Sequence, residues 1–402
     1  MKKIITLACM VASMMGIAQT AYITQNSNSC VYVINVATNT AFDIIQVGNG
    51  PLGVSVCPDG SKVYIVNQGN DTVSVISTAT NSVTAQIHVG HGPYGLAVSP
   101  DGSKVYVSNE FGNTVSVINT SNNTVSATIP VVSGPEGIAI SHDGSKVFVA
   151  NSGSTIVNII STSTNTVTNI IEVGSSPREI TVSPNDSTAY VTDYDYNRVS
   201  VINSSTNTLS LNIGVGNNPF GICISADGSK VYVANNADNT VSVINTATNT
   251  VSNTIAVGTS PMGVSESPDG TKVYVANFQD NTISVINTAT NTVSATIPVG
   301  LHPVAFGNFI SSNTSGIPSL SNEPATISIY PNPNSGTFTL HSQLSILNSQ
   351  FIISDVLGRE VYHQPINQST QATIDISQCS NGVYFYQITN GKETGRGKFV
   401  KE

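Results

Sequence analysis

One phrase returns along the chain at a fixed interval, and this repeat constrains the fold more than any other feature. PDGSKVYIVN at residues 58–67 is followed by PDGSKVYVSN at residues 100–109, 42 residues later. The phrase opens at six positions without drift: Pro58, Pro100, His142, Pro184, Ala226 and Pro268. A further copy at residues 16–57 lacks the opening turn, so seven copies span residues 16–309. A constant period of this length indicates that each copy is one structural unit stacked on its neighbours.

Each copy carries four short β patterns separated by turns. In the second copy they are KVYIVN (62–67), TVSVIST (72–78), SVTAQIHV (82–89) and YGLAVS (94–99). Small or polar residues alternate with Val, Ile, Leu and Tyr, as in strands, and PDGS favours a tight turn because Gly tolerates a positive φ. Four strands in each of seven copies predict an all-β fold, a seven-bladed β-propeller over residues 19–311. A solenoid is the rival interpretation, but β solenoid repeats are usually shorter.

The two ends of the repeat array predict how the ring closes. The array begins with AYITQ (21–25), which matches the second strand of a copy. It ends with PVAFGNFI (303–310), which matches a first, innermost strand. We therefore expect the last strand to complete the blade that the N-terminal strands begin. Closure of this kind removes the open sheet edges that a linear stack would expose.

Composition indicates an exported protein that does not bind nucleic acid. Residues 1–18 combine two lysines with a short apolar run, which predicts a secretory signal peptide. Only 9% of the residues are charged and the formal net charge is −9, so a nucleic-acid backbone is not an expected partner. The remaining cysteines, Cys30, Cys57, Cys223 and Cys379, do not share a repeat position, so they are not a metal set. We interpret Cys57 and Cys223 as small buried residues.

The repeat stops near residue 311, and a different pattern follows. Residues 312–325 are rich in Ser, Asn and Pro, which predicts a flexible linker. Residues 326–402 alternate apolar and polar positions between Gly and Asn turns. This second pattern predicts a small antiparallel β-sandwich at the C-terminus.

Two family resemblances accompany these patterns. The copies resemble the YVTN β-propeller repeat of surface-layer and exported proteins, most clearly in KVYVANNADNTVSVINTATNTVSNTIAVGTSPMGV (230–264). The tail resembles the C-terminal sorting domain of the type IX secretion system of Bacteroidetes, through YPNPNSG, DVLGREV and NGVYFYQI with GKFVK. The second resemblance implies that the type IX machinery is a partner of residues 326–402. It also implies that the protein is secreted or held at the cell surface.

Function is expected where the copies differ, on the face formed by the second-to-third-strand loops and the segments entering each innermost strand. In the fourth copy Arg178 follows the repeated proline and Glu179 replaces the usual Gly. We expect a glycan, an extracellular protein or its peptide, or a matrix component to bind here, with tyrosines as flat platforms and Arg178 as a bidentate donor. The predicted ligand-binding residues are Tyr94, Glu136, Arg178, Glu179, Asp193, Tyr194, Asp195, Tyr196 and Phe220. Arg178 paired with Glu136 or Glu179 as a solvated ion pair is the alternative.

Catalysis is not expected, because no nucleophile with its base, no carboxylate–His pair and no metal set are evident in the sequence. Cofactors are therefore not predicted, although Asp193 and Asp195 could offer oxygen ligands to Ca²⁺. The expected function is non-catalytic binding or adhesion outside the cell. A structural surface-layer element is one alternative, and a lactonase-like hydrolase dependent on Glu266 or His91 is the other. Glu266 stands in an otherwise aliphatic column, which favours a position facing the wet central channel.

Overall fold

The computed structural model describes residues 19–311 and, in the tail, residues 328–330, 335–341, 349–355, 359–366, 371–389 and 394–401. The chain divides into two compact units, Met1–Gly316 and Ile317–Glu402. The predicted signal peptide (1–18) and linker (312–325) lie outside the described residues. The described residues contain no helix that is both long and apolar enough to cross a membrane.

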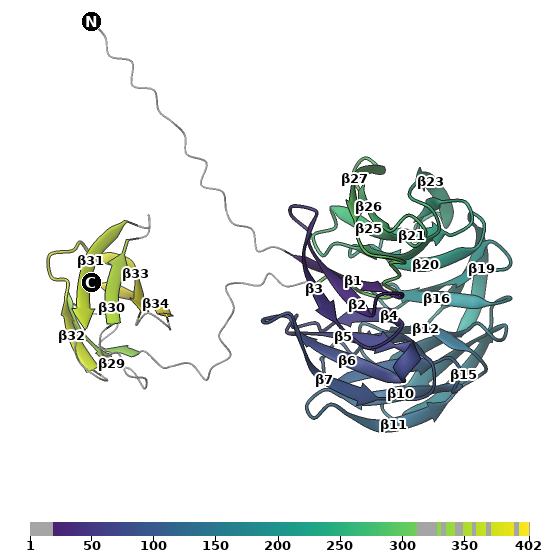
Figure 1. Ribbon diagram of the computed structural model, residues 1–402, viewed down its shortest axis with the longest axis horizontal. Coiled ribbons are helices and arrows are strands. Elements are labelled where there is room, and N and C mark those ends of the chain that lie inside the picture. Colours follow the sequence, from purple (N-terminus) through teal and green to yellow (C-terminus); the bar gives the residue numbers. More distant parts are fainter. Residues whose placement is uncertain are drawn as a thin grey trace, which may run out of the picture. The chain divides into compact units, whose positions relative to one another are not determined.

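The first unit is a ring of four-stranded antiparallel sheets, which confirms the predicted seven-bladed propeller (Figure 1). Blades 1 to 6 each run in chain order from an innermost to an outermost strand. The innermost strands are β4 (Pro51–Val56), β8 (Pro93–Val98), β12 (Pro135–Ile140), β16 (Pro177–Val182), β20 (Pro219–Ile224) and β24 (Pro261–Glu266). The second strands are β5 (Lys62–Asn67), β9 (Lys104–Asn109), β13 (Lys146–Asn151), β17 (Thr188–Asp193), β21 (Lys230–Asn235) and β25 (Lys272–Asn277).

The outer half of each blade completes the sheet. The third strands are β6 (Thr72–Ser77), β10 (Thr114–Asn119), β14 (Ile156–Ser161), β18 (Arg198–Asn203), β22 (Thr240–Asn245) and β26 (Thr282–Asn287). The outermost strands are β7 (Ser82–His88), β11 (Thr124–Pro130), β15 (Thr166–Glu172), β19 (Thr208–Gly214), β23 (Thr250–Ala256) and β27 (Thr292–Pro298). One 3-10 turn, η1 (Gln68–Asn70), interrupts the first blade between β5 and β6.

The core lies between neighbouring blades, on the second and third strands. These strands are buried on both faces, whereas the outermost strands alternate exposed and half-buried residues. One repeat position forms a layer of aromatic side chains that are at most 3% exposed: Tyr22, Tyr64, Tyr106, Phe148, Tyr190, Tyr232 and Tyr274. Seven equivalent rings packed in this way support the blades rather than a ligand.

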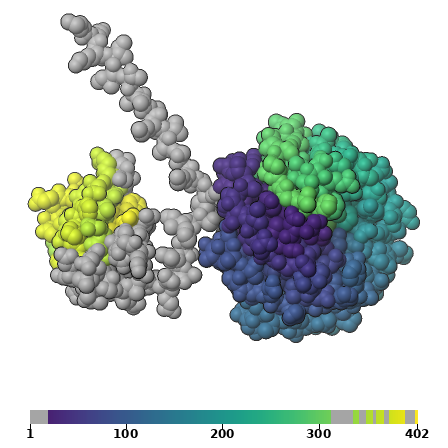
Figure 2. Space-filling model, viewed as in Figure 1, coloured from purple at the N-terminus to yellow at the C-terminus, as the bar shows by residue number. Residues whose placement is uncertain are grey.

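Blade 7 joins the two ends of the array, as the sequence predicts. It consists of β1 (Thr20–Gln25), β2 (Cys30–Asn35), β3 (Thr40–Gln46) and the segment 303–310 as its innermost strand. The backbone N–H of Tyr22 donates to the carbonyl of Phe309 at 2.9 Å, and that of Val304 donates to Thr24 at 3.0 Å. In Figure 2 the N-terminal strands accordingly lie beside the last strands of the ring.

Lysine side chains tie most adjacent blades together. The lysine that opens the second strand reaches a backbone carbonyl of the next blade, 2.6–3.3 Å away, in five cases: Lys62, Lys104, Lys146, Lys230 and Lys272. Thr188 opens the second strand of blade 4 and is too short for this contact. Blade 4 is therefore attached to blade 5 without this contact.

The second unit is an antiparallel sandwich. One sheet contains β28 (Ser328–Tyr330), β29 (Thr337–His341) and β32 (Gln371–Asp375). The other contains β31 (Glu360–Ile366), β30 (Ser349–Ser354), β33 (Gly382–Thr389) and β34 (Thr394–Lys401). Phe338 and Ile374 from the first sheet pack in one apolar cluster with Phe351, Tyr386 and Phe399 from the second. This shared core confirms the predicted sandwich.

Candidate functional site

The propeller has two chemically different ends. At one end, here called the loop face, the second-to-third-strand loops meet the segments that enter the innermost strands; for example, the N–H of Gln68 donates to the carbonyl of Gly50. At the other end, the turn face, the repeated PDGS turns are closed by aspartates such as Asp59, which accepts from the Ser61 backbone at 2.9 Å. Sequence variation is concentrated at the loop face.

An aromatic plug closes the central channel at the loop face. The ring of Phe306 stacks between Tyr94 and Phe220, with centroid distances of 5.3 and 5.1 Å. All three rings are buried. Phe306 comes from the closing segment, where Ala305 and Gly307 have positive φ and the chain departs from a regular strand. The sequence places Tyr94 and Phe220 around an open mouth, but the structure packs them into this plug.

Arg178 lies beside the plug and is held by partners on three elements. Its Nη1 donates to Glu136 Oε1 at 2.5 Å, and Ser152 donates to the same oxygen at 2.6 Å. The guanidinium carbon is 4.9 Å from the ring centre of Tyr194 and 5.4 Å from that of Phe220. Of the two pairings that the sequence left open, the structure shows the one with Glu136.

Burial and charge act in opposite directions on this ion pair. Burial alone would lower the pKa of Arg178, but the charge and hydrogen bond of Glu136 raise it above its ordinary value. The Glu136 side chain is only 2% exposed, whereas a quarter of the Arg178 side chain reaches solvent. The pair is therefore a partly buried contact rather than the solvated one considered from the sequence, and its cationic end faces the loop surface.

The predicted acidic loop divides into a buried and an exposed part. Asp193 is fully buried, and its Oδ2 accepts from Arg198 Nε at 2.7 Å. Asp195 is exposed and accepts from the hydroxyl of Ser175 at 2.8 Å, and Tyr196 is 59% exposed. Asp193 is therefore part of the buried interior of its blade and is not exposed at the loop face. The residues that remain available at the loop face are Arg178, Tyr194, Asp195 and Tyr196, here called the loop-face patch.

Asp193 and Arg198 replace a pair that recurs in other copies. At the same positions Asn67 donates to Thr72 at 3.0 Å, and Asn235 donates to Thr240 at 3.0 Å. The fifth copy therefore exchanges a neutral amide–hydroxyl bond for an ion pair at one repeat position. This substitution explains the local concentration of charge without a metal. Among the described residues, no group of three or more His, Cys, Asp or Glu could hold a metal ion.

Glu179 points to the other side of its strand from Arg178, because neighbouring residues on a strand alternate. It lines the central channel below the plug. Burial, and then the negative charge of Glu136, raise the pKa of Glu179 to about 8. The equivalent residues in five other blades are glycines at which a Cβ would lie 2.0–2.6 Å from a carbonyl of the next blade: Gly53, Gly95, Gly137, Gly221 and Gly263.

Thr192 accompanies the exchange of glycine for glutamate in blade 4. Its hydroxyl bonds to the carbonyl of Phe220 in the next blade at 2.7 Å. In blade 7, where Ala305 occupies the same column, Thr24 donates in the same way to Leu52 at 2.7 Å. Ser108 makes the same kind of bond to the Glu136 carbonyl in blade 2, where the column keeps Gly95, so this contact joins blades both with and without the glycine.

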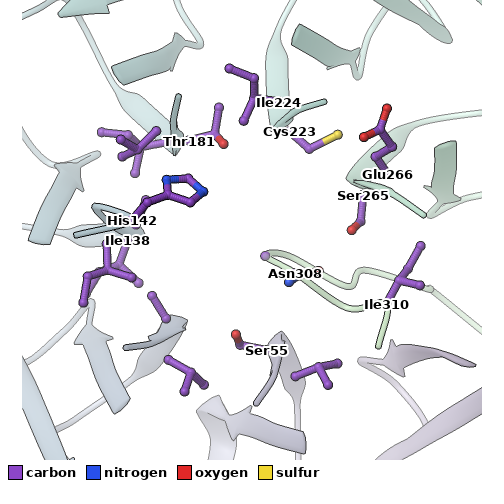
Figure 3. A pocket seen from close by; sticks show the side chains of 18 of the residues that line it. Ser55, Ile138, His142, Thr181, Cys223, Ile224, Ser265, Glu266, Asn308 and Ile310 are labelled. Carbon is purple, nitrogen blue, oxygen red and sulfur yellow. The ribbon is translucent and has the colours of Figure 1, made fainter. Parts of the chain in front are cut away.

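Below the plug the channel forms a cavity of about 580 Å³ that opens among the turns (Figure 3). Its wall is aliphatic at positions such as Ile138 and Ile224, with hydroxyls from Ser55, Thr181 and Ser265. Around the opening, the His142 ring projects inward and Cys223 lies next to Glu266. As the sequence predicts, Glu266 lines the channel. Burial raises its pKa, and it accepts from the backbone of Ala226 at 2.7 Å.

Comparison of the copies did not single out this cavity in advance, although it does identify residues of its wall. Cys223, Thr181 and Asn308 interrupt columns of small or aliphatic residues at the ends of the innermost strands. The analysis also missed two His–Asp pairs. His91 lies 3.1 Å from Asp71 on the loop face, and His142 lies 3.4 Å from Asp186 on the turn face. Both histidines are more than half exposed, and Asp71 and Asp186 also accept backbone bonds that fix their loops.

Comparison with known proteins agrees with this architecture. Residues 46–215 match the model of the lactonase family of seven-bladed β-propellers, and residues 217–330 match that of YNCE-like β-propellers. Residues 328–402 match the model of the secretion system C-terminal sorting domain. Among curated proteins, none matches this sequence.

Solved structures share the ring at low sequence identity. A putative 6-phosphogluconolactonase from Bacteroides fragilis is 19% identical, with a TM-score of 0.63, over 73% of this chain and 98% of that one. One from Bacteroides uniformis is 18% identical, with a TM-score of 0.63, over 72% and 98%. Hydrazine synthase from Kuenenia stuttgartiensis is 22% identical, with a TM-score of 0.62, over 67% and 92%. At these identities the likeness establishes the fold.

These findings establish the organisation of the chain. It is a β-propeller, consistent with YVTN-type repeats, followed by a type IX secretion system sorting domain. The sorting domain directs export to the cell surface or the extracellular space and makes the secretion machinery a partner of this protein.

Proposed function

We propose that this exported propeller is a non-catalytic binding protein that recognises a glycan, peptide or matrix component through the loop-face patch. The observation that carries the proposal is the position of Arg178. Glu136 and two aromatic rings fix its guanidinium, while a quarter of its side chain remains exposed. A preorganised cation beside exposed aromatic rings offers hydrogen bonds and stacking at little cost in side-chain entropy.

The surroundings of the patch support this assignment. Tyr194 is half-buried against Phe220, whereas Asp195 and Tyr196 are exposed next to it. The Tyr196 ring is also packed under Arg198, 4.8 Å from its guanidinium carbon. Aromatic platforms held by cations, with a neighbouring carboxylate, are suited to the polar and apolar faces of a sugar ring or peptide.

The experiment is a binding screen with the full exported chain against arrays of glycans and extracellular proteins. Arg178→Ala and Tyr194→Ala should each reduce binding of the identified ligand by about tenfold or more, as for truncation of central interface residues. Arg359→Ala, which removes an exposed arginine from the sorting domain, should leave binding unchanged. A ligand that binds equally to all three variants would exclude the loop-face patch as the site.

Lactone hydrolysis is the second candidate, because residues 46–215 match the lactonase family model. The two His–Asp pairs do not favour it, since both histidines are exposed, the pairs lie at opposite faces, and only His142 is among the residues that line the cavity. Incubation of the full chain with a panel of sugar lactones tests this candidate. Lactone hydrolysis by the wild type that is lost in Glu266→Gln would support a hydrolytic function in place of the proposed binding function.

A further inference from the structure

The central cavity has the form of a binding site separate from the loop-face patch. It is lined by the innermost strands and by turn-face residues such as Pro58 and Pro268, while the plug of Tyr94, Phe220 and Phe306 packs at the loop-face end. Its volume of about 580 Å³ lies within the range of small-molecule sites. The aliphatic wall and the few polar groups on it also match the usual composition of such sites.

The ionisable residues of the lining favour a positively charged ligand over a negatively charged one. The lining residues include two carboxyl groups, Glu179 near the plug and Glu266 near the opening, and no lysine or arginine. His142 is the one basic residue of the lining, and its Nδ1 is directed toward Asp186. An anion would therefore find no lysine or arginine in this cavity, whereas a cation would find two carboxyl groups that can ionise.

Glu179 is the group that a ligand would meet at the closed end. Its side chain is 6% exposed, and Oε1 has no hydrogen-bond partner. Arg178, the adjacent residue on β16, is bonded to Glu136 and does not satisfy it. A buried carboxyl oxygen without a partner is unfavourable unless a ligand or water supplies a donor.

We propose that the cavity binds a small primary alkylamine in its ammonium form, with the ammonium group on Glu179 and the alkyl chain along the aliphatic wall. Three donors on an ammonium group can bind the carboxyl group of Glu179 and nearby hydroxyls such as Thr181, which line the same cavity. The chain would pack against Ile180 and Ile222, which line the same depth of the cavity. Glu266 at the opening adds a negative field that attracts cations into the channel.

Binding in this site is coupled to the release of a proton. The pKa of Glu179 is raised to about 8 by burial and by Glu136, so the carboxyl group is mostly protonated at pH 7. The titratable groups near it are Glu136 on β12, Tyr94 on β8 and Arg178 on its own strand. An ammonium ion requires the carboxylate form. The apparent affinity should therefore rise by about tenfold per pH unit below pH 8.

The test is calorimetric titration of the full chain with n-hexylammonium chloride between pH 6 and 9, with 1-hexanol as the uncharged analogue. We expect binding of hexylammonium with release of close to one proton at pH 7, and at least tenfold weaker binding of hexanol, as charge-assisted hydrogen bonds imply. No binding of hexylammonium, or equal binding of hexanol, would overturn the proposal.

Variants at Glu179 separate a ligand site from a structural role. Glu179→Gly restores the residue found at this position in other blades and should fold, and Glu179→Gln retains the shape of the side chain. Both should lose at least tenfold in hexylammonium affinity and lose the proton release. Glu110→Gln is the matched control, because Glu110 is a half-buried carboxyl group outside the cavity. Unchanged hexylammonium affinity in Glu179→Gly, with the propeller transition retained, would overturn the proposal.

Discussion

The contribution of the Asp193–Arg198 ion pair to stability can be compared with that of the neutral Asn–Thr pairs at the same positions in other copies. Arg198→Thr introduces threonine, which other copies have at this position as Thr72 and Thr240. The Asp193 carboxylate stays fully buried in this variant. Removing one partner of a buried ion pair costs about 3–5 kcal/mol, because the remaining charge has no counter-ion. Among the described residues, the Asp193 Oδ1 atom already lacks a hydrogen-bond partner, and apart from Arg198 only the Tyr196 backbone favours the charged form of Asp193.

The double variant Asp193→Asn/Arg198→Thr should recover that loss. It recreates the neutral bond that joins Asn67 to Thr72 at 3.0 Å, and replacing a whole buried ion pair is often neutral or stabilising. We expect Asp193→Asn alone to cost about 1–2 kcal/mol, through the weaker hydrogen bond to Arg198. The double variant should lie within about 1 kcal/mol of the wild type, which gives a strong coupling between the two positions.

Thermal unfolding of the full chain, followed at the propeller transition, measures these changes. A domain of this size loses about 1 °C in Tm for each ~0.6 kcal/mol. Arg198→Thr should therefore lower Tm by about 5–8 °C at pH 8, and the double variant by at most about 2 °C.

The effect of pH on Arg198→Thr follows from the pKa of Asp193. Burial raises this pKa in the wild type, and Arg198 opposes the increase. Without Arg198 the pKa rises further, so protonation relieves the buried charge as the pH falls. A group whose folded-state pKa is raised favours the folded state at low pH and loses that contribution as the pH increases. The penalty should therefore be smaller at pH 5 than at pH 8. A double variant as unstable as Arg198→Thr would refute the reasoning.

Three further predictions concern other contacts between blades and the plug, each measured by thermal or denaturant unfolding of the full chain. Thr188→Lys should stabilise the propeller by about 0.5–1.5 kcal/mol, because it adds the lysine–carbonyl bond that Lys230 makes to the next blade. No gain in stability would mean that this bond also contributes little to the stability of the other blades. Phe306→Ala should destabilise by about 3–5 kcal/mol, since it removes the central ring of the plug, and a loss below about 1 kcal/mol would show that the plug collapses easily. Gly137→Ala should be strongly destabilising because the new Cβ would lie 2.4 Å from the Arg178 carbonyl, whereas Gly214→Ala, with no atom within 4 Å of the Cβ, should be neutral.

The repeat made most of the propeller predictable, because the same local pattern had to satisfy seven equivalent environments. The strand order, the turns, the aromatic layer and the pairing of residues 21–25 with 303–310 all follow from periodicity and register. The plug does not, because it depends on Phe306 leaving the strand path between Ala305 and Gly307, which both have positive φ. One local departure from the repeat thus decides which end of the channel is closed.

The candidate site was only partly predictable for a related reason. Comparison of copies identified Arg178 and Glu179 as exceptions, but it treated them as one cluster. Their alternation along β16 sends Arg178 toward the loop face and Glu179 into the cavity. Asp193 also looked like a surface residue, because an acidic loop is usually exposed. Its true position follows from the buried asparagine column, where Asn67 and Asn235 are fully inaccessible.

The contacts that close the ring determine when the propeller can finish folding and which C-terminal residues it needs. Thr24 bonds to Ala305 across a separation of 281 residues, so a nascent chain cannot complete the circle until nearly all of the propeller has been synthesised. Contacts this distant form slowly, since a long stretch of chain must first be ordered. The N–H of Ser311 also donates to Thr20. Loss of the C-terminal part of the chain up to and including Ser311 would therefore remove contacts that close the ring.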